Sequence, residues 1–235
     1  MRRITRLPYA AAVPHPLPLF GLNVPLVPGL MLPLHVFEPR YRRLVELLLA
    51  EPDEQAREFG LVSVREGHDP AVEGIDALFP VGTSALLRQA DRLEDGRFDI
   101  VTSGYRRFRL RSVDTSDPLL HGDVDWLDDV TGPSDEAIAP LVTAAFADYR
   151  AALAIRLAGV SDGSDEVPSD PTILSYLVTA AMVLSADERQ RLLAAESTHA
   201  RLVDALRLLR LETAIIDEFG CVPALELPGP SPSAN

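Results

Sequence analysis

The chain has 235 residues, 47% of them hydrophobic and 24% charged, which is typical of a soluble globular protein large enough to bury a core without disulfides. Its formal net charge of −13 repels polyanions and disfavours a general nucleic-acid-binding protein. All 22 basic residues are arginine, so the absence of lysine excludes a Walker A loop, a Ser/Lys protease and a Schiff-base enzyme.

The N-terminal segment imitates a secretory signal, since basic residues precede apolar ones, but several prolines interrupt the apolar core that a signal needs. We therefore expect residues 1–16 to be a flexible leader. No apolar run approaches the roughly 20 residues that span a bilayer. The single Cys221 excludes an intramolecular disulfide, and we interpret it as a packing or helix-end residue rather than a nucleophile. These features predict a cytoplasmic protein without a membrane segment.

Residues 17–129 alternate between apolar and polar side chains, with turn signals between short runs, which predicts a β-rich subdomain. Asp95-Gly96 is typical of a tight hairpin turn, because such a turn needs positive φ angles. The clearest strands are expected at residues 59–65, 81–93, 96–104, 105–113 and 120–126.

The segment from residue 31 to residue 46, "MLPLHVFEPRYRRLVE", contains a histidine and a glutamate three positions apart. If the segment begins as a strand, His35 and Glu38 point to opposite faces, which is poor geometry for a shared metal or a proton relay. The remaining histidines are scattered singly and show no zinc-ligand spacing. We therefore expect no metal site and no catalytic role here.

A strand-to-helix junction explains the same segment better. Pro39 suits the first position of a helix, and Glu38 lies at the positive end of that helix, where a carboxylate is favoured. Tyr41 begins an apolar stripe along the helix. We expect Arg40 to be held at the junction, and we treat Glu38, Pro39, Arg40 and Tyr41 as one structural motif.

The strand expected at 105–113 places Arg107, Arg109 and Arg111 on one face. Such a row could grip phosphates, which makes RNA binding through these three arginines the alternative function. The chain's negative charge favours the other interpretation, a solvated face balanced by nearby acidic side chains.

Residues 130–221 change to helical patterns, and residues 222–235 are expected to form a disordered tail. Leucines and one isoleucine recur at spacings of three and four along a last helix at about 198–219, which predicts packing against another helix. Three helix starts carry capping signals: Ser134 before a helix at about 135–158, Asp170 followed by Pro171, and a capping box formed by Ser185 and Glu188.

Two longer stretches resemble a known family. "LPLFGLNVPLVPGLMLPLHVFEPRYRRLVE" from residue 17 and "VGTSALLRQADRLEDGRFDIVTSGYRRFRL" from residue 81 are similar to the N-terminal domain of Lon protease, the substrate-binding domain of that ATP-dependent protease. The resemblance covers roughly residues 17–219. It implies an α+β fold in which an N-terminal PUA-like β pseudobarrel is followed by a C-terminal α-helical bundle. It also implies a stand-alone domain, because the ATPase and the Ser/Lys peptidase of Lon need lysines.

The resemblance implies a non-enzymatic module that recognises unfolded or exposed apolar segments of other proteins. An ATP-dependent protease that receives such segments is a further expected partner. The loop "LNVPLVPGL" supplies candidates, since Leu22, Val24, Leu26 and Val27 would form an exposed apolar patch; the alternative is a buried connection between strands. No G-x-S-x-G, H-E-x-x-H or glycine-rich phosphate loop is present, so no catalytic residue, metal or cofactor is expected.

The purified chain is expected to hydrolyse neither ATP nor casein, because both activities of Lon-type proteases depend on lysine side chains that this chain lacks. Turnover should be measured against a heat-killed sample after contaminating proteases have been removed. Activity above that control would contradict the expectation.

Overall fold

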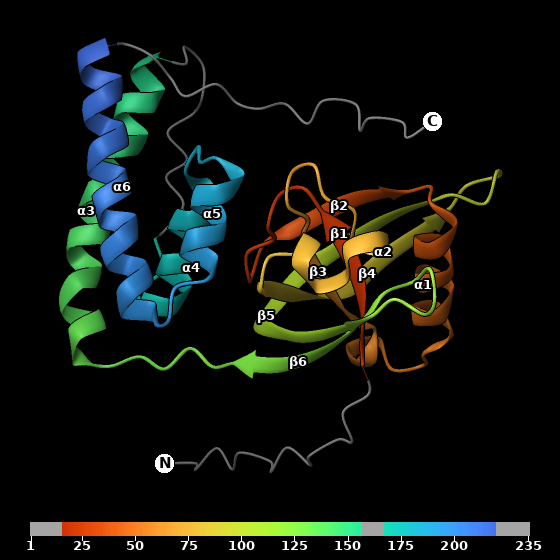
Figure 1. Cartoon of the computed structure of the whole chain (residues 1–235). Coiled ribbons are helices and arrows are strands. Elements are labelled where there is room, and N and C mark those ends of the chain that lie inside the picture. Colours follow the sequence, from red (N-terminus) through yellow and green to blue (C-terminus); the bar gives the residue numbers. More distant parts are fainter. Residues whose placement is uncertain (1–15, 157–166, 220–235) are drawn as a thin grey trace, which may run out of the picture.

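The structure, a computed structural model, describes residues 16–156 and 167–219 (Figure 1). Most of the predicted leader, Cys221 and the predicted tail over residues 222–235 lie outside these residues. Within them, a mixed sheet is followed by a bundle of helices that lies beside it, so the expected α+β fold is confirmed.

The sheet closes into the expected pseudobarrel. Its strand order is β2-β5-β4-β3-β1-β6, and β5 also pairs with β6, so the pairings lead back to β5. Closure is possible because β5 has 17 residues, enough to pair with β2 along its first half and with β6 along its second. The strands are β1 (Leu17–Leu22), β2 (Met31–Val36), β3 (Glu58–Ser63), β4 (Val81–Arg92), β5 (Phe98–Asp114) and β6 (His121–Leu127).

β5 is one strand where the sequence predicted two, at 96–104 and 105–113. Gly104 lies inside this strand, where the loop between β1 and β2 crosses it closely. A Cβ at Gly104 would lie 2.4 Å from the carbonyl oxygen of Val27. The predicted tight turn before β5 is present and Gly96 has a φ of 80°, but Asp95 does not have the predicted positive φ.

β2 lies at the edge of the sheet and contains Pro33. The Gly104 amide donates to the Leu30 carbonyl at 2.9 Å, so by the alternation of an antiparallel ladder the backbone of Pro33 faces away from β5. The missing N–H of Pro33 therefore costs no ladder bond, and it weakens the free edge as a template for another strand.

The junction between β2 and α1 (Pro39–Ala50) is held from both sides. The Tyr41 hydroxyl accepts a hydrogen bond from the Gly21 amide at 3.0 Å, and the Tyr41 ring stacks on Phe20 with centroids 3.8 Å apart. The Glu38 carboxylate does not cap the helix; it accepts from Arg40 Nε at 2.9 Å instead. Arg40 also lies over the Tyr41 ring, 4.7 Å from its centroid.

The remaining helices are α2 (Pro70–Glu73), α3 (Pro133–Arg156), α4 (Pro171–Ala181), α5 (Ala186–Leu193) and α6 (Thr198–Phe219). The cap at Asp170, the capping box of Ser185 and Glu188, and the last helix are confirmed. α3 begins two residues earlier than predicted, so Ser134 lies in its first turn rather than at its cap.

α3 is long and apolar enough over Pro133–Ile155 to cross a membrane, judged by length and composition only. The central helix of a folded core has the same properties. Val142, Phe146 and Tyr149 pack here in the hydrophobic cluster of the bundle. The expectation of no membrane segment stays a prediction.

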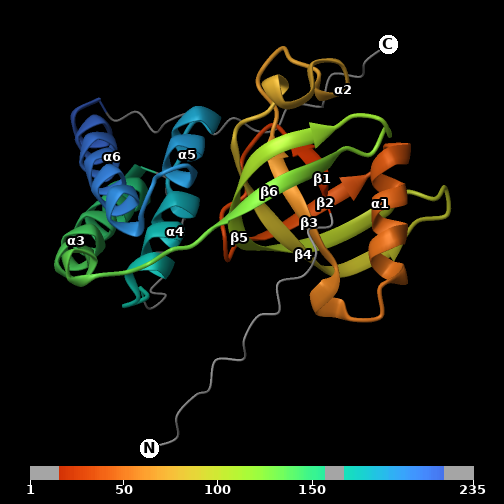
Figure 2. The same cartoon turned by 60° about the horizontal axis from the view of Figure 1, so that its bottom comes forward.

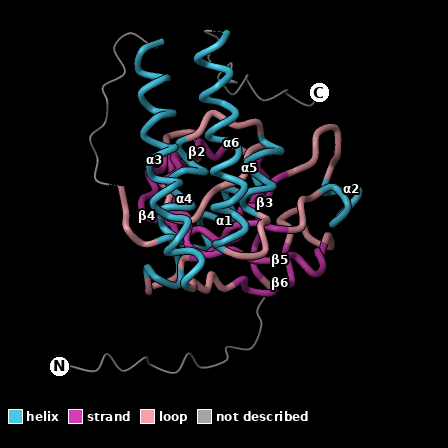
Figure 3. The backbone as a smooth tube through the Cα atoms, turned by 90° about the vertical axis from the view of Figure 1, so that its left-hand side faces the viewer, coloured by secondary structure: helices cyan, strands magenta, loops and turns pink. Residues whose placement is uncertain are grey.

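The chain has separate hydrophobic cores in its two halves. Among the described residues, one cluster contains only residues between Ile138 and Ile216, whereas the other two contain only residues between Leu17 and Val124. We call residues 17–127 the β part and residues 133–219 the helical part. Residues 128–132 link them along one side of the molecule (Figures 1 and 2). Viewed from the helical side, α3 and α6 lie in front of the sheet (Figure 3).

Arg40→Ala is expected to lower the free energy of unfolding by about 1 kcal/mol, because a half-buried arginine loses both its carboxylate partner and its aromatic neighbour. The matched change Arg42→Ala should stay within about 0.5 kcal/mol, since no ion pair involving Arg42 is seen among the described residues. Urea denaturation measures both values. Equal destabilisation by the two changes would contradict the role of Arg40 at the junction.

Candidate functional site

A groove of about 490 Å³ lies between the β part and α4. This volume is within the range of small-ligand and peptide side-chain pockets. Leu30 and Tyr105 form the wall on the β side, and Ile173 and Leu177 form the wall on α4. All four side chains are exposed, by 38%, 56%, 56% and 37% respectively. The other lining residues are Pro28, Gly29, Arg106, Leu127, Asp128, Asp129, Pro168, Thr172, Tyr176 and Ala180.

α4 supplies its wall because the helix is apolar on two faces. Leu174 and Val178 are buried in the helical core, whereas Ile173, Leu177 and Ala180 lie on a second stripe that faces the groove. An ordinary surface helix carries polar residues opposite its core face. The apolar outer stripe of α4 is therefore available for contact with a ligand.

An arginine–aromatic pair flanks the β side of the groove. The Arg106 guanidinium lies 3.3 Å from the centroid of the Trp126 ring and donates to the Glu58 carboxylate at 3.2 and 3.3 Å. Trp126 and Tyr105 are 37% and 56% exposed. Tyrosine, tryptophan and arginine are the residue types that most often carry binding energy at protein interfaces.

The loop between β1 and β2 contributes less than the sequence predicted. Leu26 and Val27 are buried, which contradicts their predicted place in an exposed patch. The Thr83 hydroxyl donates to the Leu26 carbonyl at 2.7 Å, and Gly104 lets the Val27 backbone lie directly against β5. Leu22 is half-buried and only Val24 is well exposed. The loop is therefore mostly a buried connection, and only its last residues reach the groove.

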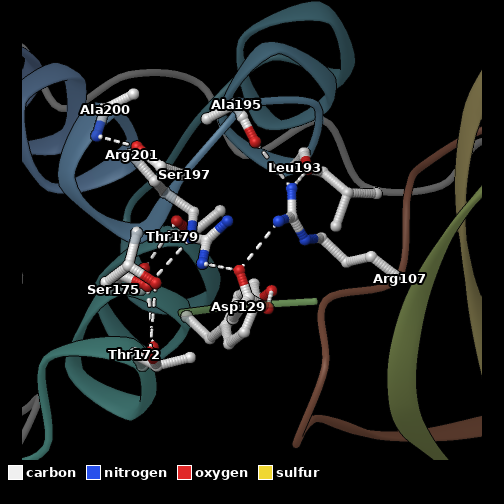
Figure 4. Close-up of polar contacts among 12 residues, drawn as sticks. Arg107, Asp129, Thr172, Ser175, Thr179, Leu193, Ala195, Ser197, Ala200 and Arg201 are labelled. Carbon is white, nitrogen blue, oxygen red and sulfur yellow. Dashed lines mark hydrogen bonds and ion pairs between the residues drawn. The ribbon is translucent and has the colours of Figure 1, made fainter. Parts of the chain in front are cut away.

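Beside the groove, a buried polar cluster joins the two parts (Figure 4). Arg107 extends from β5 and its side chain is 1% exposed. Its guanidinium donates to the carbonyls of Leu193 and Ala195 at 2.9 and 2.7 Å, where α5 ends, and to the Asp129 carboxylate at 2.7 Å. The negative end of the α5 dipole therefore faces this cation.

Asp129 is the centre of this cluster. Arg201, fully buried on α6, donates to the same carboxylate oxygen of Asp129 at 2.8 Å. The Tyr176 hydroxyl of α4 donates to the second oxygen. Arg201 also donates to the Ser175 hydroxyl at 2.8 Å and lies 4.0 Å from the centroid of the Tyr176 ring. We call Arg107, Asp129, Tyr176 and Arg201 the joint cluster.

The joint cluster keeps Asp129 ionised. Burial by itself would raise the pKa of the Asp129 carboxyl, but hydrogen bonds from Arg201 and Tyr176, together with the charges of Arg201 and Arg107, outweigh it and hold this pKa below its usual value. Burial raises the pKa of the Tyr176 phenol far above its usual value. Tyr176 is therefore a hydrogen-bond donor here and not a base.

Arg107, Arg109 and Arg111 do not form the predicted exposed row. Arg107 is drawn into the joint cluster, whereas Arg109 is exposed and Arg111 pairs with Asp125. The interpretation of Arg107 as part of a solvated face was wrong because the helical part covers that end of β5. No pattern in the sequence pairs Arg107 with Asp129 or Arg201, which lie 22 and 94 positions away.

His35 and Glu38 are not brought together. His35 Nδ1 lies 2.6 Å from the Asp99 carboxylate and His35 Nε2 lies 3.0 Å from Arg97, on the exposed side of the hairpin. Glu38 pairs with Arg40 instead. In the described part of the chain, no group of three or more His, Cys, Asp or Glu side chains is placed to hold a metal ion.

Comparison with known proteins decides the family. Residues 16–210 match the model of the family described as the ATP-dependent protease La (LON) substrate-binding domain. The chain belongs to this family. It is 31% identical over 186 residues to Lon protease 2 of Syntrophobacter fumaroxidans, and 29% identical over 213 residues to the Lon protease of Roseiflexus castenholzii. These matches cover 77% and 87% of the chain but only 22% and 25% of the two proteases.

Solved structures of Lon N-terminal domains show the same fold. A Lon N-terminal domain protein from Xanthomonas campestris matches with a TM-score of 0.59 at 24% identity, over 82% of this chain and 98% of that one. The N-terminal domain of the Mycobacterium avium complex Lon protease matches with a TM-score of 0.62 at 18% identity, over 85% and 98%.

Asp129→Asn is expected to lower the free energy of unfolding at pH 7 by about 3 kcal/mol, because it leaves two buried guanidinium groups without a counter-charge. The depressed pKa means that the carboxylate stabilises the fold above the pKa of an unfolded aspartate, about 3.9, and that this stabilisation is lost as the pH falls through the lower folded value.

The difference in the free energy of unfolding between wild type and Asp129→Asn should therefore stay constant from pH 7 to about pH 5 and shrink below about pH 4. Urea denaturation at each pH measures it. Asp148→Asn, on the exposed side of α3, is the matched control and should change little. A difference that grows on acidification would contradict an ionised Asp129 in the folded state.

Proposed function

We propose that the chain is a non-enzymatic module whose groove binds exposed apolar segments of other proteins. Membership of the Lon substrate-binding domain family supports protein binding in general. The observation that supports binding of apolar segments in particular is the groove, whose two walls expose Leu30, Tyr105, Ile173 and Leu177. Folded chains bury their apolar side chains, so a site of this kind selects segments that are unfolded or locally exposed.

The energetics favour weak and reversible binding. Burying one large apolar side chain contributes about 1.5–3 kcal/mol, and a groove of about 490 Å³ accepts only a few such side chains. Ordering an unfolded segment opposes this gain. We expect dissociation constants in the micromolar range, which correspond to a binding free energy of about −8 kcal/mol. The affinity should depend little on salt, because the contacts are apolar.

The polar groups at the groove are unsuited to catalysis. The Tyr176 hydroxyl is bonded to Asp129, the Asp129 carboxylate is held by two arginines, and the Thr172 hydroxyl lies 3.1 Å from that of Thr198. A nucleophile needs an adjacent base with a free lone pair. The nearest base, the Asp129 carboxylate, is held by two arginines that lower its pKa and so weaken it as a base.

Delivery of the bound segment to a separate ATP-dependent protease is the second part of the proposal. It rests on the family and on relatives that are Lon proteases, of which the chain spans about a quarter or less. Co-purification of such a protease with the tagged chain from its native cells would support an adaptor role.

A cytoplasmic location stays a prediction. We do not propose RNA binding, because Arg107 is committed to the joint cluster.

Ile173→Ser combined with Leu177→Ser is expected to weaken binding of reduced, carboxymethylated α-lactalbumin about tenfold, since the pair loses about 1.4 kcal/mol of apolar contact. Fluorescence anisotropy of the labelled probe measures the affinity. Both side chains face the groove and not the helical core, so the fold should be kept.

Val72→Ser combined with Ile155→Ser is the matched control, because both side chains are more exposed and neither lines the groove. The control pair should bind the probe like wild type. If both pairs weaken binding equally, or neither does, the groove is not the binding site.

A further inference from the structure

We propose that Asp129 is the positioning residue of the groove: its carboxylate holds the β part and the helical part in the one orientation at which the two groove walls face each other. The effect of Asp129 on client binding rests on the proposed function. Its effect on the orientation of the two parts does not depend on that function.

The joint between the two parts lacks a shared hydrophobic core. The three hydrophobic clusters of the described residues each lie wholly within one part. The parts are linked by residues 128–132, which form neither strand nor helix, and Asp129 lies within this linker. Parts of a chain that meet through a small polar interface move relative to each other unless specific contacts prevent it.

The hydrogen bonds between the two parts centre on the joint cluster. Arg107 binds the end of α5 and Asp129, and Asp129 binds α6 through Arg201 (Figure 4). Asp129 also binds α4 through Tyr176. The bond from the Gln190 side-chain amide to the Val81 carbonyl, 2.8 Å long, is a further contact between α5 and β4. One carboxylate thus ties three elements of the molecule to the linker.

The joint cluster has more buried hydrogen-bond donors than acceptors. Two buried guanidinium groups share one carboxylate, and Arg107 Nε and Arg201 Nη1 have no hydrogen-bond partner among the described residues. Without the charge of Asp129, the two cations would be buried together and uncompensated. Separation of the two parts would let water reach them, so loss of this charge favours an open joint.

The joint cluster acts directly on the groove walls. Tyr176 precedes Leu177 on α4, and Arg107 follows Arg106 and Tyr105 on β5, so each wall is within two residues of a cluster member. Tyr176 and Asp129 themselves line the groove, whereas Arg107 and Arg201 do not. A change at Arg107 therefore separates positioning from direct contact with a client.

The test measures orientation and binding in the full chain. Nitroxide labels are placed on Val72→Cys in α2 and Leu211→Cys in α6, both exposed, in a Cys221→Ser background. Pulsed electron paramagnetic resonance gives the distribution of distances between the two parts. The variants are Asp129→Asn and Arg107→Gln, and Asp117→Asn is the control, since it breaks an arginine pair that lies inside the β part.

Both joint variants should broaden the distance distribution and weaken binding of carboxymethylated α-lactalbumin at least fivefold, whereas Asp117→Asn should change neither. An unbroadened distribution in folded Asp129→Asn and Arg107→Gln would overturn the proposal. Broadening with unchanged binding would also overturn it, since the groove would then not need the orientation. If wild type fails to bind the probe, the proposed function fails while the distances still test the joint.

Near-ultraviolet circular dichroism checks that each variant is folded. If Asp129→Asn and Arg107→Gln do not fold, Tyr176→Phe takes their place, because it removes one hydrogen bond to Asp129 and keeps the ring in the wall. Its expected result is a smaller broadening in the same direction, and a distribution identical to wild type would count against the proposal.

Discussion

The orientation of the two halves of this molecule depends on one buried carboxylate, that of Asp129, which binds an arginine from each half. Each half of the chain has its own hydrophobic core, so the hydrophobic effect stabilises the halves but does not fix how they meet. Directional bonds do that instead: Arg107 from the barrel and Arg201 from the bundle converge on Asp129, which belongs to the linker between them. Burying three charges is costly, and such a network favours one geometry over its alternatives more than it adds stability. The groove lies where this geometry brings the two parts together.

Two motifs in the stretch from residue 81 that resembles the Lon N-terminal domain, "VGT" at residues 81–83 and "GYRRF" at residues 104–108, have a structural role in this chain. The Thr83 hydroxyl of the first motif donates to the carbonyl of Leu26, and Gly104 of the second, inside β5, leaves room for the backbone of Val27. Both motifs thereby fasten the loop between β1 and β2 to the barrel. One arginine of the second motif, Arg107, leaves the barrel and binds the end of α5. The motifs therefore build the barrel side of the groove, and the second also lines it through Tyr105 and Arg106.

The sequence predicted the elements well where local chemistry determines them. Pro39, Asp170 and the pair of Ser185 and Glu188 start helices through contacts within one turn, and the Asp95-Gly96 turn follows from the φ angle that glycine permits. It failed where distant segments decide. Leu26 and Val27 were predicted to be exposed, but contacts with the distant Thr83 and Gly104 bury them. Arg107 was predicted to be solvated, but its partners come from α5 and the linker. The groove was not predicted, since the residues of its two walls lie more than 60 positions apart in the sequence.

Site-specific photo-crosslinking tests the central claim, that clients bind between the barrel and α4. A benzoylphenylalanine is placed at Leu177 in the groove or at Val72 outside it, and each folded variant is irradiated with carboxymethylated α-lactalbumin. The structure predicts a covalent adduct from position 177 that excess unlabelled probe competes away, and none from position 72. Equal adducts from both positions, or an adduct from position 72 alone, would contradict binding in the groove.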